Sequence, residues 1–454
     1  MGVTRTEDWE RLTELVEAAR RKHGVPGAAV GLLRDGEATA AGFGVTSVDH
    51  PLDVTAETLF QIGSITKTFT GTILMRLADA GEIDLDSAVR AYVPSFRVAD
   101  EDVSARATLR HLLTHVGGWA GDLFVDSGEG ADALARYVER MAELKQVAPL
   151  GEVWSYNNAG FAVAGLVIER VTGTDYATAL REKLLAPLGL EQCRLDAAET
   201  IAERFAVGHT VGSDGAKVAR PWALPRAVLP MGGIMASAGD LLTYAGFHLG
   251  DGSSPDGSRI LARETLALMH APAVTVRGVD AWGLPFSIDD THGVRLVSHG
   301  GGTVGQASLL AMVPEKALAF VVLTNADRGN ALIADVTRWV FRELLGIEIE
   351  DPKPIDSTED ELARLVGRYE RPFVDLELGL LHGRLVGQLA YKKSFPTEDA
   401  PPIPMPPPMA LARCDDDRLI VLDGPTKDQT LDVIARGGAI EWLRFGGRVL
   451  RRRA

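Results

Sequence analysis

A proline-bearing linker divides the chain into two segments of different character, and this division constrains the fold more than any other feature. The linker, residues 351–361, reads Asp-Pro-Lys-Pro-Ile-Asp-Ser-Thr-Glu-Asp-Glu. Polar, proline-containing stretches separate domains because few contacts cross them. Within the 454 residues we therefore expect two domains, residues 1–350 and residues 362–454.

The pattern before the linker predicts an α+β domain. Apolar residues recur at helical spacing over 7–22, and residues 28–33 and 37–45 resemble two strands joined at the hairpin dipeptide Asp35-Gly36. Residues 64–250 are mainly helical. Three strands are then predicted at 294–297, 306–313 and 318–323. A closing helix is predicted at 330–345. This order predicts an antiparallel sheet flanked by helices.

The pattern after the linker predicts a small antiparallel β-barrel. Short alternating segments are separated by turn dipeptides: 374–378, 384–391, 418–422, 431–434 and 440–445. A proline-rich loop, residues 396–408, interrupts them. Such a loop is either an extended surface connection or a stiff lid.

The composition narrows the classes of partner. The net charge is −15 and charged residues make up 24% of the chain, which disfavours nucleic acid and anionic membranes as partners. The charged N-terminal stretch has no signal-peptide core, so we expect a cytoplasmic protein. Cys193 and Cys414 lie far apart and predict neither a disulfide nor a metal site.

The segment Phe60-Gln-Ile-Gly-Ser-Ile-Thr-Lys67 carries the first chemical signal. It precedes an apolar-periodic helix, so Ser64 and Lys67 lie one turn apart on one face. A serine needs a base to become a nucleophile, and lysine can be that base when desolvation lowers its pKa. The Ser-x-x-Lys pattern is weak by itself, but no other Lys in the chain has a Ser three residues earlier.

Two further segments add chemistry. In Trp154-Ser-Tyr-Asn-Asn158, a phenol at Tyr156 could relay a proton and the Asn158 amide could orient an amine and a substrate. The third is His299-Gly-Gly-Gly302. Its glycines fit the formal G-x-G-x-x-G pattern, but a further strand and a turn follow instead of a helix, so we reject dinucleotide binding.

Together and in this order, the three segments resemble the motifs of the serine β-lactamase and penicillin-binding-protein superfamily, closest to its class C-like branch. The resemblance extends over most of residues 10–345. It implies a β-lactamase/transpeptidase-like fold with Ser64 as the nucleophile, Lys67 as its base and Tyr156 as the proton shuttle. It also implies that Asn158 orients Lys67 and the substrate.

The same resemblance implies an oxyanion hole from the backbone N–H groups of Ser64 and Gly302. His111 and His115 have a spacing that metal ligands use, but the resemblance makes them structural. We expect no metal and no cofactor.

The third segment departs from the family, because His299 stands where many members have lysine. A neutral histidine removes a fixed cation, which argues against a β-lactamase. If His299 is a neutral hydrogen-bond donor, activity should fall as the pH drops through its protonation range. The remaining candidates for substrate contact are Trp154, Gly300, Gly301, Arg444 and Arg448.

The layout resembles penicillin-binding-protein-type thioesterases of nonribosomal peptide synthesis, which carry a C-terminal lipocalin-like domain. It implies a peptide (thio)ester substrate with a D-configured residue, presented on a carrier protein, and head-to-tail macrocyclisation. The alternatives are a D-amino-acid peptidase, amidase or esterase, then a β-lactamase or a non-catalytic peptide-binding member. The sequence does not identify the peptide or the oligomeric state.

Overall fold

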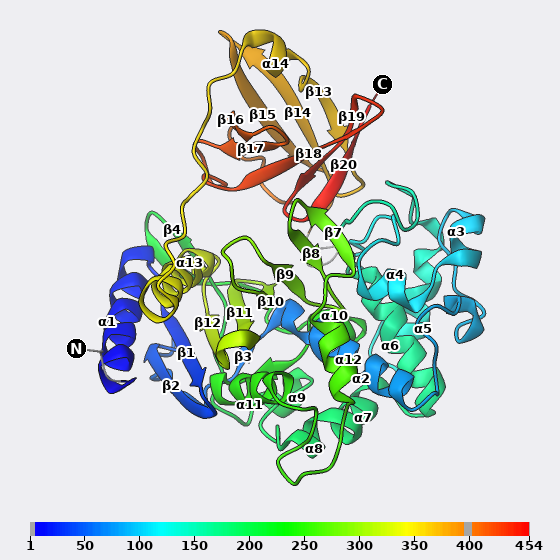
Figure 1. The fold of residues 1–454 in the computed structure, drawn as a ribbon, viewed down its shortest axis with the longest axis vertical. Coiled ribbons are helices and arrows are strands. Elements are labelled where there is room, and N and C mark those ends of the chain that lie inside the picture. The colour runs from blue at the N-terminus through cyan, green and yellow to red at the C-terminus, as the bar shows by residue number, and fades with distance from the viewer. Residues whose placement is uncertain (1–4, 395–401, 454) are drawn as a thin grey trace.

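The larger domain consists of one antiparallel sheet with helices packed against it (Figure 1). The computed structural model describes residues 5–394 and 402–453. Within them, eight antiparallel strands form one sheet in the order β2-β1-β12-β11-β10-β9-β8-β7. Their bounds are β2 (Glu37–Gly44), β1 (Gly27–Arg34), β12 (Leu318–Thr324), β11 (Gln306–Val313), β10 (Leu296–Thr303), β9 (Ser287–Asp289), β8 (Asp280–Trp282) and β7 (Val274–Arg277).

Helices cover both faces of this sheet. On one face, α1 (Arg5–His23) and α13 (Gly329–Trp339), which continues into a π-turn at Val340–Leu345, bury an apolar stripe that includes Leu12, Val16 and Val336. On the other, α11 (Ala238–Leu249) packs against β1 and β12. No helix in the described part of the chain has the length and apolar character needed to cross a membrane.

The remaining helices form a mainly helical region beside the sheet (Figure 1). They are α2 (Thr66–Asp79), α3 (Glu101–Arg106), α4 (Leu109–Leu113), α5 (Ala133–Arg140), α6 (Ala159–Thr172), α7 (Tyr176–Leu180), α8 (Ala186–Leu188), α9 (Ala197–Thr200), α10 (Leu229–Gly232) and α12 (Arg263–Met269). Two small strand pairs lie outside the main sheet: β3 (Phe60–Gln61) with β6 (Met235–Ala236), and β4 (His209–Gly212) with β5 (Gly215–Val218). The apolar α6 is buried along most of its length and packs against α2, so the region shares one core with the sheet.

The predicted α+β architecture is confirmed. In the half of the sheet from β10 to β7, the strands differ from the prediction in two ways. The strand predicted to end at Val297 continues to Thr303 as β10, because its glycines pair with β11 in regular antiparallel register. The short strands β7 and β8 were not predicted. They have mixed polarity and only a few residues each, so neither periodicity nor length marks them.

The C-terminal domain is a closed antiparallel barrel, as predicted. Its strands within the described residues are β13 (Gly367–Glu370), β14 (Val374–Leu381), β15 (Arg384–Tyr391), β16 (Met409–Asp415), β17 (Arg418–Val421), β18 (Thr430–Arg436), β19 (Ala439–Phe445) and β20 (Arg448–Arg452). Of these, β13, β16 and β20 were not predicted. The short helix α14 (Glu359–Ala363) precedes the barrel. Residues 395–401 of the proline-rich loop lie outside the described residues, and 402–408 have no regular secondary structure.

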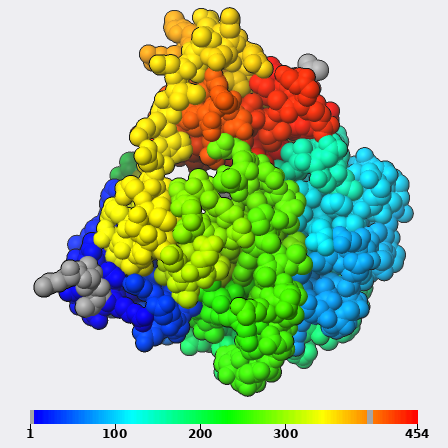
Figure 2. All heavy atoms as spheres, viewed as in Figure 1, coloured from blue at the N-terminus to red at the C-terminus, as the bar shows by residue number. Residues whose placement is uncertain are grey.

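The barrel sits on the larger domain over the helical region and the β7–β8 hairpin (Figures 1 and 2). Trp442 buries its ring against Ala148 and Val153, and its indole N–H donates to the Val147 carbonyl at 2.8 Å. Arg444, only 4% exposed, donates to the carbonyls of Trp154 and Val276 at 3.3 and 2.8 Å. Backbone carbonyls of one domain therefore receive donors from the other.

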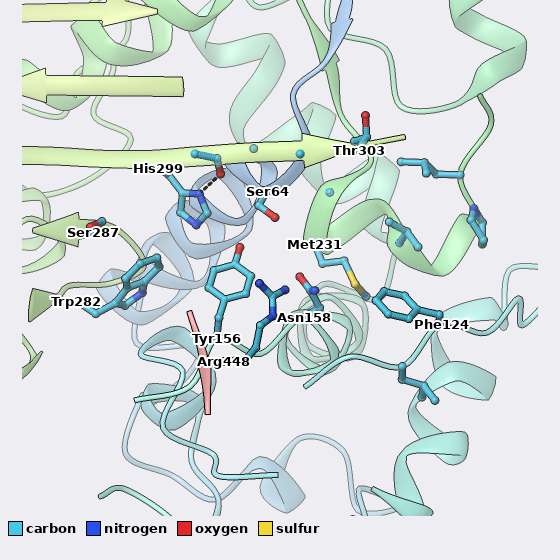
Figure 3. Close-up of a pocket in the computed structure, with 18 of the residues that line it drawn as sticks. Ser64, Phe124, Tyr156, Asn158, Met231, Trp282, Ser287, His299, Thr303 and Arg448 are labelled. Carbon is cyan, nitrogen blue, oxygen red and sulfur yellow. Dashed lines mark hydrogen bonds between the residues drawn. The ribbon is translucent and has the colours of Figure 1, made fainter. Parts of the chain in front are cut away.

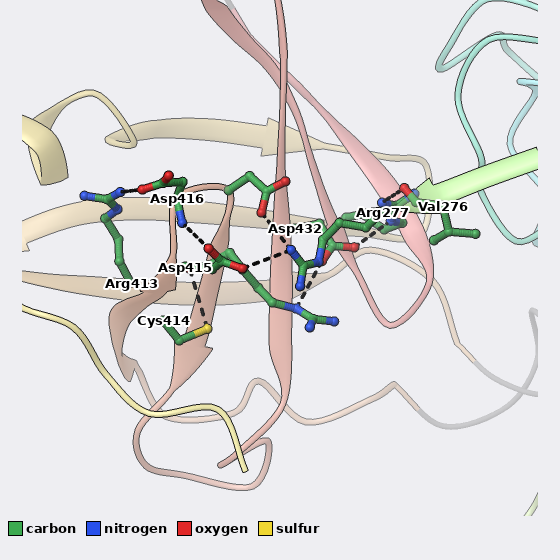
Figure 4. A network of polar contacts seen from close by, with 10 residues as sticks. Val276, Arg277, Arg413, Cys414, Asp415, Asp416 and Asp432 are labelled. Atoms are coloured by element: carbon green, nitrogen blue, oxygen red, sulfur yellow. Dashed lines mark hydrogen bonds and ion pairs between the residues drawn. The ribbon is translucent and has the colours of Figure 1, made fainter. Parts of the chain in front are cut away.

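A charged network strengthens the same contact (Figure 4). Arg277 of β7 reaches the barrel carboxylates of Asp415 and Asp417 at 3.2 and 2.9 Å. Asp432 on β18 accepts from Arg444 at 2.9 Å and lies 3.6 Å from Arg277. Asp415 and Asp417 are exposed, whereas Asp432 is largely buried, so its attraction to Arg277 and Arg444 is screened less than that of the two surface carboxylates.

We predict that Arg444→Ala loosens the barrel. It deletes three hydrogen bonds from a charged, buried donor, each worth more than a neutral bond. We expect the free energy of unfolding to fall by about 2 kcal/mol, measured by urea denaturation. Arg384→Ala, an exposed arginine of the same barrel, is the matched control. Equal effects of the two substitutions would contradict this role of Arg444.

Candidate active site

Ser64 and Lys67 meet at the start of α2. Ser64 lies in a single 3₁₀ turn, Gly63–Ile65, and α2 begins immediately after it. The Lys67 amine lies 3.0 Å from the Ser64 hydroxyl and donates to the Met231 carbonyl at 2.5 Å. The helix geometry therefore brings the predicted nucleophile and base into hydrogen-bond contact.

The surroundings of Lys67 favour its uncharged form. The side chain is fully buried, and this burial, followed by the positive charge of Arg448, lowers the pKa of Lys67 well below its usual value. The Asp122 carboxylate acts in the opposite direction but does not outweigh them. An unprotonated amine can accept the Ser64 proton, which is what a general base must do.

Tyr156 lies between the two domains and points its hydroxyl toward Ser64 (Figure 3). Its backbone N–H donates to the Gly447 carbonyl of the barrel at 2.8 Å. The Arg448 guanidinium lies 4.7 Å from the ring centroid, and the Lys67 amine lies 5.0 Å from it. Burial raises the pKa of Tyr156, and the neighbouring Ser64 hydroxyl and Arg448 oppose this rise. The phenol therefore keeps its proton and lies beside the Ser64 hydroxyl, where the predicted proton shuttle would have to lie.

Asp122 forms hydrogen bonds and ion pairs with residues of both domains. Its carboxylate accepts from Asn158 at 2.9 Å, from two nitrogens of Arg448 at 3.2 Å each, and from Arg371 at 3.3 Å. Burial acts to raise the pKa of Asp122, but the two arginines outweigh it, so the pKa is lowered. Asp122 thus stays ionised and holds Arg448 over Tyr156.

The structure revises the expected contact of Asn158. Its amide nitrogen donates to Asp122, and among the hydrogen bonds of the described residues it makes none with Lys67. The Lys67 amine instead forms hydrogen bonds with the Met231 carbonyl and the Ser64 hydroxyl. Asn158 still lines the cavity beside Ser64, so its contact with a substrate remains a prediction.

The imidazole of His299 is neutral, and its one N–H group already forms a hydrogen bond within the protein. Because a carbonyl can only accept, the Nδ1–H donates to the Gly300 carbonyl at 2.6 Å. Burial and then the charge of Lys67 lower the pKa of His299 to about 3. The buried Nε2, which has no partner among the described residues, is therefore an acceptor. The expected donor role of His299 is wrong in this arrangement.

The predicted oxyanion hole rests on the register of β10. Thr303 and Gln306 close a two-residue hairpin, and such a closing pair exchanges both hydrogen bonds. Because hydrogen-bonded and non-hydrogen-bonded pairs alternate along an antiparallel ladder, the neighbouring Gly302 points its N–H and C=O away from β11, toward the Ser64 turn. A Cβ atom on Gly301 would lie 2.0 Å from the Ile62 carbonyl, so only glycine permits this close approach.

The same alternation exposes a strand edge. β9 pairs with β10 only from Leu296 to Ser298, and no described strand pairs with β10 beyond it on that side. The outward groups of Gly300 and Gly302 can therefore meet an extended substrate, although His299 already occupies the Gly300 carbonyl.

These groups surround one cavity of about 610 Å³ (Figure 3). Its walls come from the Ser64 turn, β10, the segment Leu123–Val125, Trp282 of β8 and Arg448 of the barrel. Ser64, Tyr156, Asn158 and His299 all line it. A cavity of this size suits a small molecule or a few peptide residues.

Two predicted substrate contacts lie outside the cavity. Trp154 is 7% exposed and packs against Trp282 and Val116 behind the cavity wall. Arg444 lies over the Trp154 ring, 5.4 Å from its centroid, and docks the barrel. Both were predicted from their place in the sequence, which cannot distinguish a cavity wall from the layer behind it.

Three groups of the site were missed: Trp282 and Met231, which line the cavity, and Asp122, which lies behind it and contacts Arg448 and Asn158. Met231 begins the segment Met-Gly-Gly233, whose paired glycines are a sequence signal for close backbone approach. Asp122 carries no motif, and its role depends on Arg448, which is remote in the sequence. His111 and His115 have structural partners: His111 lies in the capping box of α4 with Thr108, and His115 accepts from the Asn157 N–H.

The comparison with known proteins agrees with this geometry. Residues 12–342 match the Beta-lactamase family, which is more than half of the chain. The chain belongs to the Beta-lactamase family. This β-lactamase-family chain is also 36% identical over 373 residues to "Penicillin-binding protein 4" of Amycolatopsis lactamdurans, covering 79% of this chain and 96% of that protein.

Solved structures show the same fold. SurE with D-Leu covers 98% of this chain and 99% of its own, with a TM-score of 0.76 and 24% identity. The D-amino acid amidase of Ochrobactrum anthropi, solved with L-phenylalanine amide, covers 74% of this chain and 99% of its own, with a TM-score of 0.60 and 23% identity. At this identity the likeness concerns the fold alone.

We predict that Arg448→Met shifts the pH dependence of Ser64 acylation. Removing the cation raises the pKa of Lys67, so the amine becomes uncharged only at higher pH. The midpoint of the rise in acylation rate should move up by about one pH unit, measured with an activated ester. Arg448→Lys keeps the charge and should hold the midpoint near that of the wild type. An unshifted midpoint in Arg448→Met would contradict the electrostatic role of Arg448.

We also predict that His299 destabilises the fold at acidic pH. Its pKa is about 3 in the folded chain and about 6.5 when unfolded, so the unfolded chain binds the extra proton between these values. Stability therefore falls as the pH drops below 6.5. His299→Gln should remove up to about 1.4 kcal/mol of that loss per pH unit, measured by urea denaturation at pH 7, 5.5 and 4.5. The exposed His382→Gln is the control, and an equal change in both variants would refute the assignment.

Proposed function

We propose that this chain is a serine acyl transferase that forms an ester at Ser64 from a peptide thioester and passes the acyl group to an amine of the same peptide. The observation that carries the proposal is the fully buried Lys67 amine, 3.0 Å from the Ser64 hydroxyl. The family membership supports acyl transfer in general. The further step to peptide cyclisation is our proposal.

The first half of the reaction follows from the positions of three side chains. Neutral Lys67 takes the proton from Ser64 as the serine oxygen bonds to the thioester carbonyl carbon. The carbonyl oxygen becomes an oxyanion, which the N–H groups of Ser64 and Gly302 stabilise. The C–S bond then breaks, and the thiolate receives the proton from Lys67 by way of Tyr156.

The second half repeats these steps with another acceptor. The free amine of the peptide attacks the Ser64 ester carbon, and its proton passes through Tyr156 to the departing serine oxygen. An amide C–N bond forms and the ester C–O bond breaks, so thioester and amine become amide and thiol. Arg448 is the barrel residue that lines the cavity, and we propose that it reduces the access of water, which would otherwise give the free acid.

One observation supports a D-configured residue at the acylating end, and the strand edge shows where its configuration would matter. The structure of SurE that this chain resembles over 98% of its length was solved with D-Leu. A substrate chain can lie along the free edge of β10, where its configuration decides whether its side chain meets the wall at Trp282. Because the cavity presents His299 as a neutral acceptor, an anionic β-lactam carboxylate finds no cation at that position.

A D-amino-acid peptidase, amidase or esterase is the second candidate. It is favoured by the likeness to the D-amino acid amidase, which aligns over 99% of its own chain. In that case water attacks the Ser64 ester in place of an amine, and the same residues perform both steps.

We predict that a linear peptide thioester with a C-terminal D-residue acylates Ser64 and leaves as a product one water lighter than the free acid, measured by mass spectrometry. The same peptide with a C-terminal L-residue is the control and should react at least about tenfold more slowly. Ser64→Ala should give no adduct and no product. Free acid from every peptide tried would refute cyclisation and favour the hydrolase. Without an adduct from either a thioester or a fluorescent penicillin, the enzyme proposal fails.

A further inference from the structure

A second cavity shares part of its wall with the catalytic cavity. It has a volume of about 500 Å³, and Leu224 and Pro225 line both cavities. The rest of its wall comes from the start of α5, the last turn of α6, α7, α9 and Gln61 of β3. Gln61 precedes Ser64 by three residues, so the second cavity is tied to the nucleophile through a short piece of chain. We call it the acidic pocket.

The acidic pocket combines an apolar wall with an excess of carboxylates. Leu134, Leu195 and Leu229 form apolar parts of the wall. The lining includes one basic side chain, Arg226, and four acidic ones: Glu129, Glu169, Asp175 and Asp196. None of these five charged side chains forms a salt bridge with another described residue. The pocket therefore presents negative charge that the described part of the chain does not neutralise.

The four carboxylates are not equally available to a ligand. Asp175 and Asp196 cap α7 and α9 by accepting from backbone N–H groups. Glu169 accepts from the Tyr176 N–H at 3.1 Å with one oxygen only, and Glu129 is exposed and accepts no hydrogen bond from a described residue. Burial raises the pKa of Glu169, as expected for a carboxylate whose charge is incompletely compensated. Glu129 and Glu169 are thus the carboxylates that a cation can reach.

The side chain of Gln61 is an independent sign that the pocket takes a hydrogen-bond donor. Gln61 is only 4% exposed. Its Nε2 donates to the Trp222 carbonyl at 2.6 Å, and this contact fixes the orientation of the amide because a carbonyl can only accept. The other end of the amide, Oε1, is buried and has no hydrogen-bond partner among the described residues. A buried acceptor without a donor is costly, and a ligand with N–H groups removes that cost.

An alkyl ammonium group meets all of these conditions. It has three N–H donors and no acceptor, so it can satisfy one amide oxygen and two carboxylates together. The apolar wall suits the methylene stem that carries such a group. A metal ion fits less well, because no three acidic, histidine or cysteine side chains among the described residues converge closely enough to hold one.

We propose that the acidic pocket binds an ammonium group of the peptide substrate while the reacting carbonyl lies at Ser64. This inference rests on the proposed function, because it assigns a chemical feature of the peptide that this function requires. The ammonium group belongs to a side chain of the lysine or ornithine type. The N-terminal amine of the peptide has the same chemistry, but in the proposed reaction it must leave any such pocket, uncharged, to attack the Ser64 ester.

The test measures peptide binding to Ser64→Ala, which forms no acyl-enzyme. Peptide thioesters with lysine or norleucine at one position are compared, each with a free or an acetylated N-terminus, and the lysine is placed at every position in turn. Norleucine keeps the aliphatic stem and lacks the charge. At one position the lysine peptides should bind at least about tenfold more tightly than the norleucine peptides, measured by calorimetry. Acetylation should leave this preference unchanged, and high salt should reduce it.

The double variant Glu129→Gln/Glu169→Gln, made in the Ser64→Ala protein, removes both available charges and keeps the shapes of the side chains. The lysine preference should fall to about threefold or less. Because the preference is a ratio within one variant, a general loss of affinity does not imitate this result. Glu139→Gln makes the same change on α5, at an exposed position outside the pocket, and should keep the full preference.

The remaining outcomes separate the two proposals. A lysine preference in Ser64→Ala, without any product from the same peptides on the unmodified enzyme, would refute the proposed function and keep the pocket. Weaker binding after acetylation, with no effect of lysine, would keep the pocket and assign it to the N-terminal amine. The inference is overturned if neither lysine at any position nor a free N-terminus tightens binding, or if the double variant retains the preference.

Discussion

The ion pair between Asp122 and Arg448 joins the two domains at the catalytic centre. Arg448 comes from the last strand of the barrel, yet it lies over the Tyr156 ring and lowers the pKa of Lys67. Asp122 holds it in place with two contacts of 3.2 Å and also accepts from Asn158. Because an uncompensated buried charge is costly, each residue stabilises the other there, and Arg371 is the second cation on Asp122. The barrel and the catalytic groups therefore depend on one pair.

The barrel also contacts the segment Ser155–Tyr156 through backbone groups. Gly447 accepts from the Tyr156 N–H, and Ser155 accepts from the Val449 N–H. The turn between β19 and β20 has positive φ at Gly446 and Gly447, which residues with a side chain rarely adopt. The glycines are needed for this backbone conformation and not for space, because a Cβ atom on Gly447 would meet Trp154 and Tyr156 only at 3.4 to 3.6 Å. Contacts from both domains thus fix the position of Tyr156.

Much of the fold and the centre of the site could be predicted from the sequence, since local patterns carry them. Ser64 and Lys67 are one helical turn apart, and Tyr156 and Asn158 lie on one short segment, so spacing places the members of each pair together. That the two pairs form one site was implied by the family resemblance and not by spacing. Asp122, Trp282 and the role of β20 could not be predicted, because they act through contacts between segments that are remote in the chain. His299 was predicted neutral, but its tautomer depends on the Gly300 carbonyl, which no pattern of residue types reveals. Trp154 and Arg444 failed for a related reason: they stabilise the contact between the domains and do not face the cavity.

The electrostatic design sets two requirements that oppose each other. Lys67 must be desolvated and close to positive charge to work as a base, but an anionic carboxylate on the substrate would need a cation that stays charged. Lysine at position 299 would meet the second requirement in the catalytic domain itself. Here His299 is neutral, and the nearest fixed cation at the cavity is Arg448, supplied by the barrel and already neutralised in part by Asp122. The cavity therefore lacks, among the described residues, a lysine at position 299 that would hold a substrate carboxylate near Ser64, and this is consistent with the proposed thioester or amide substrate.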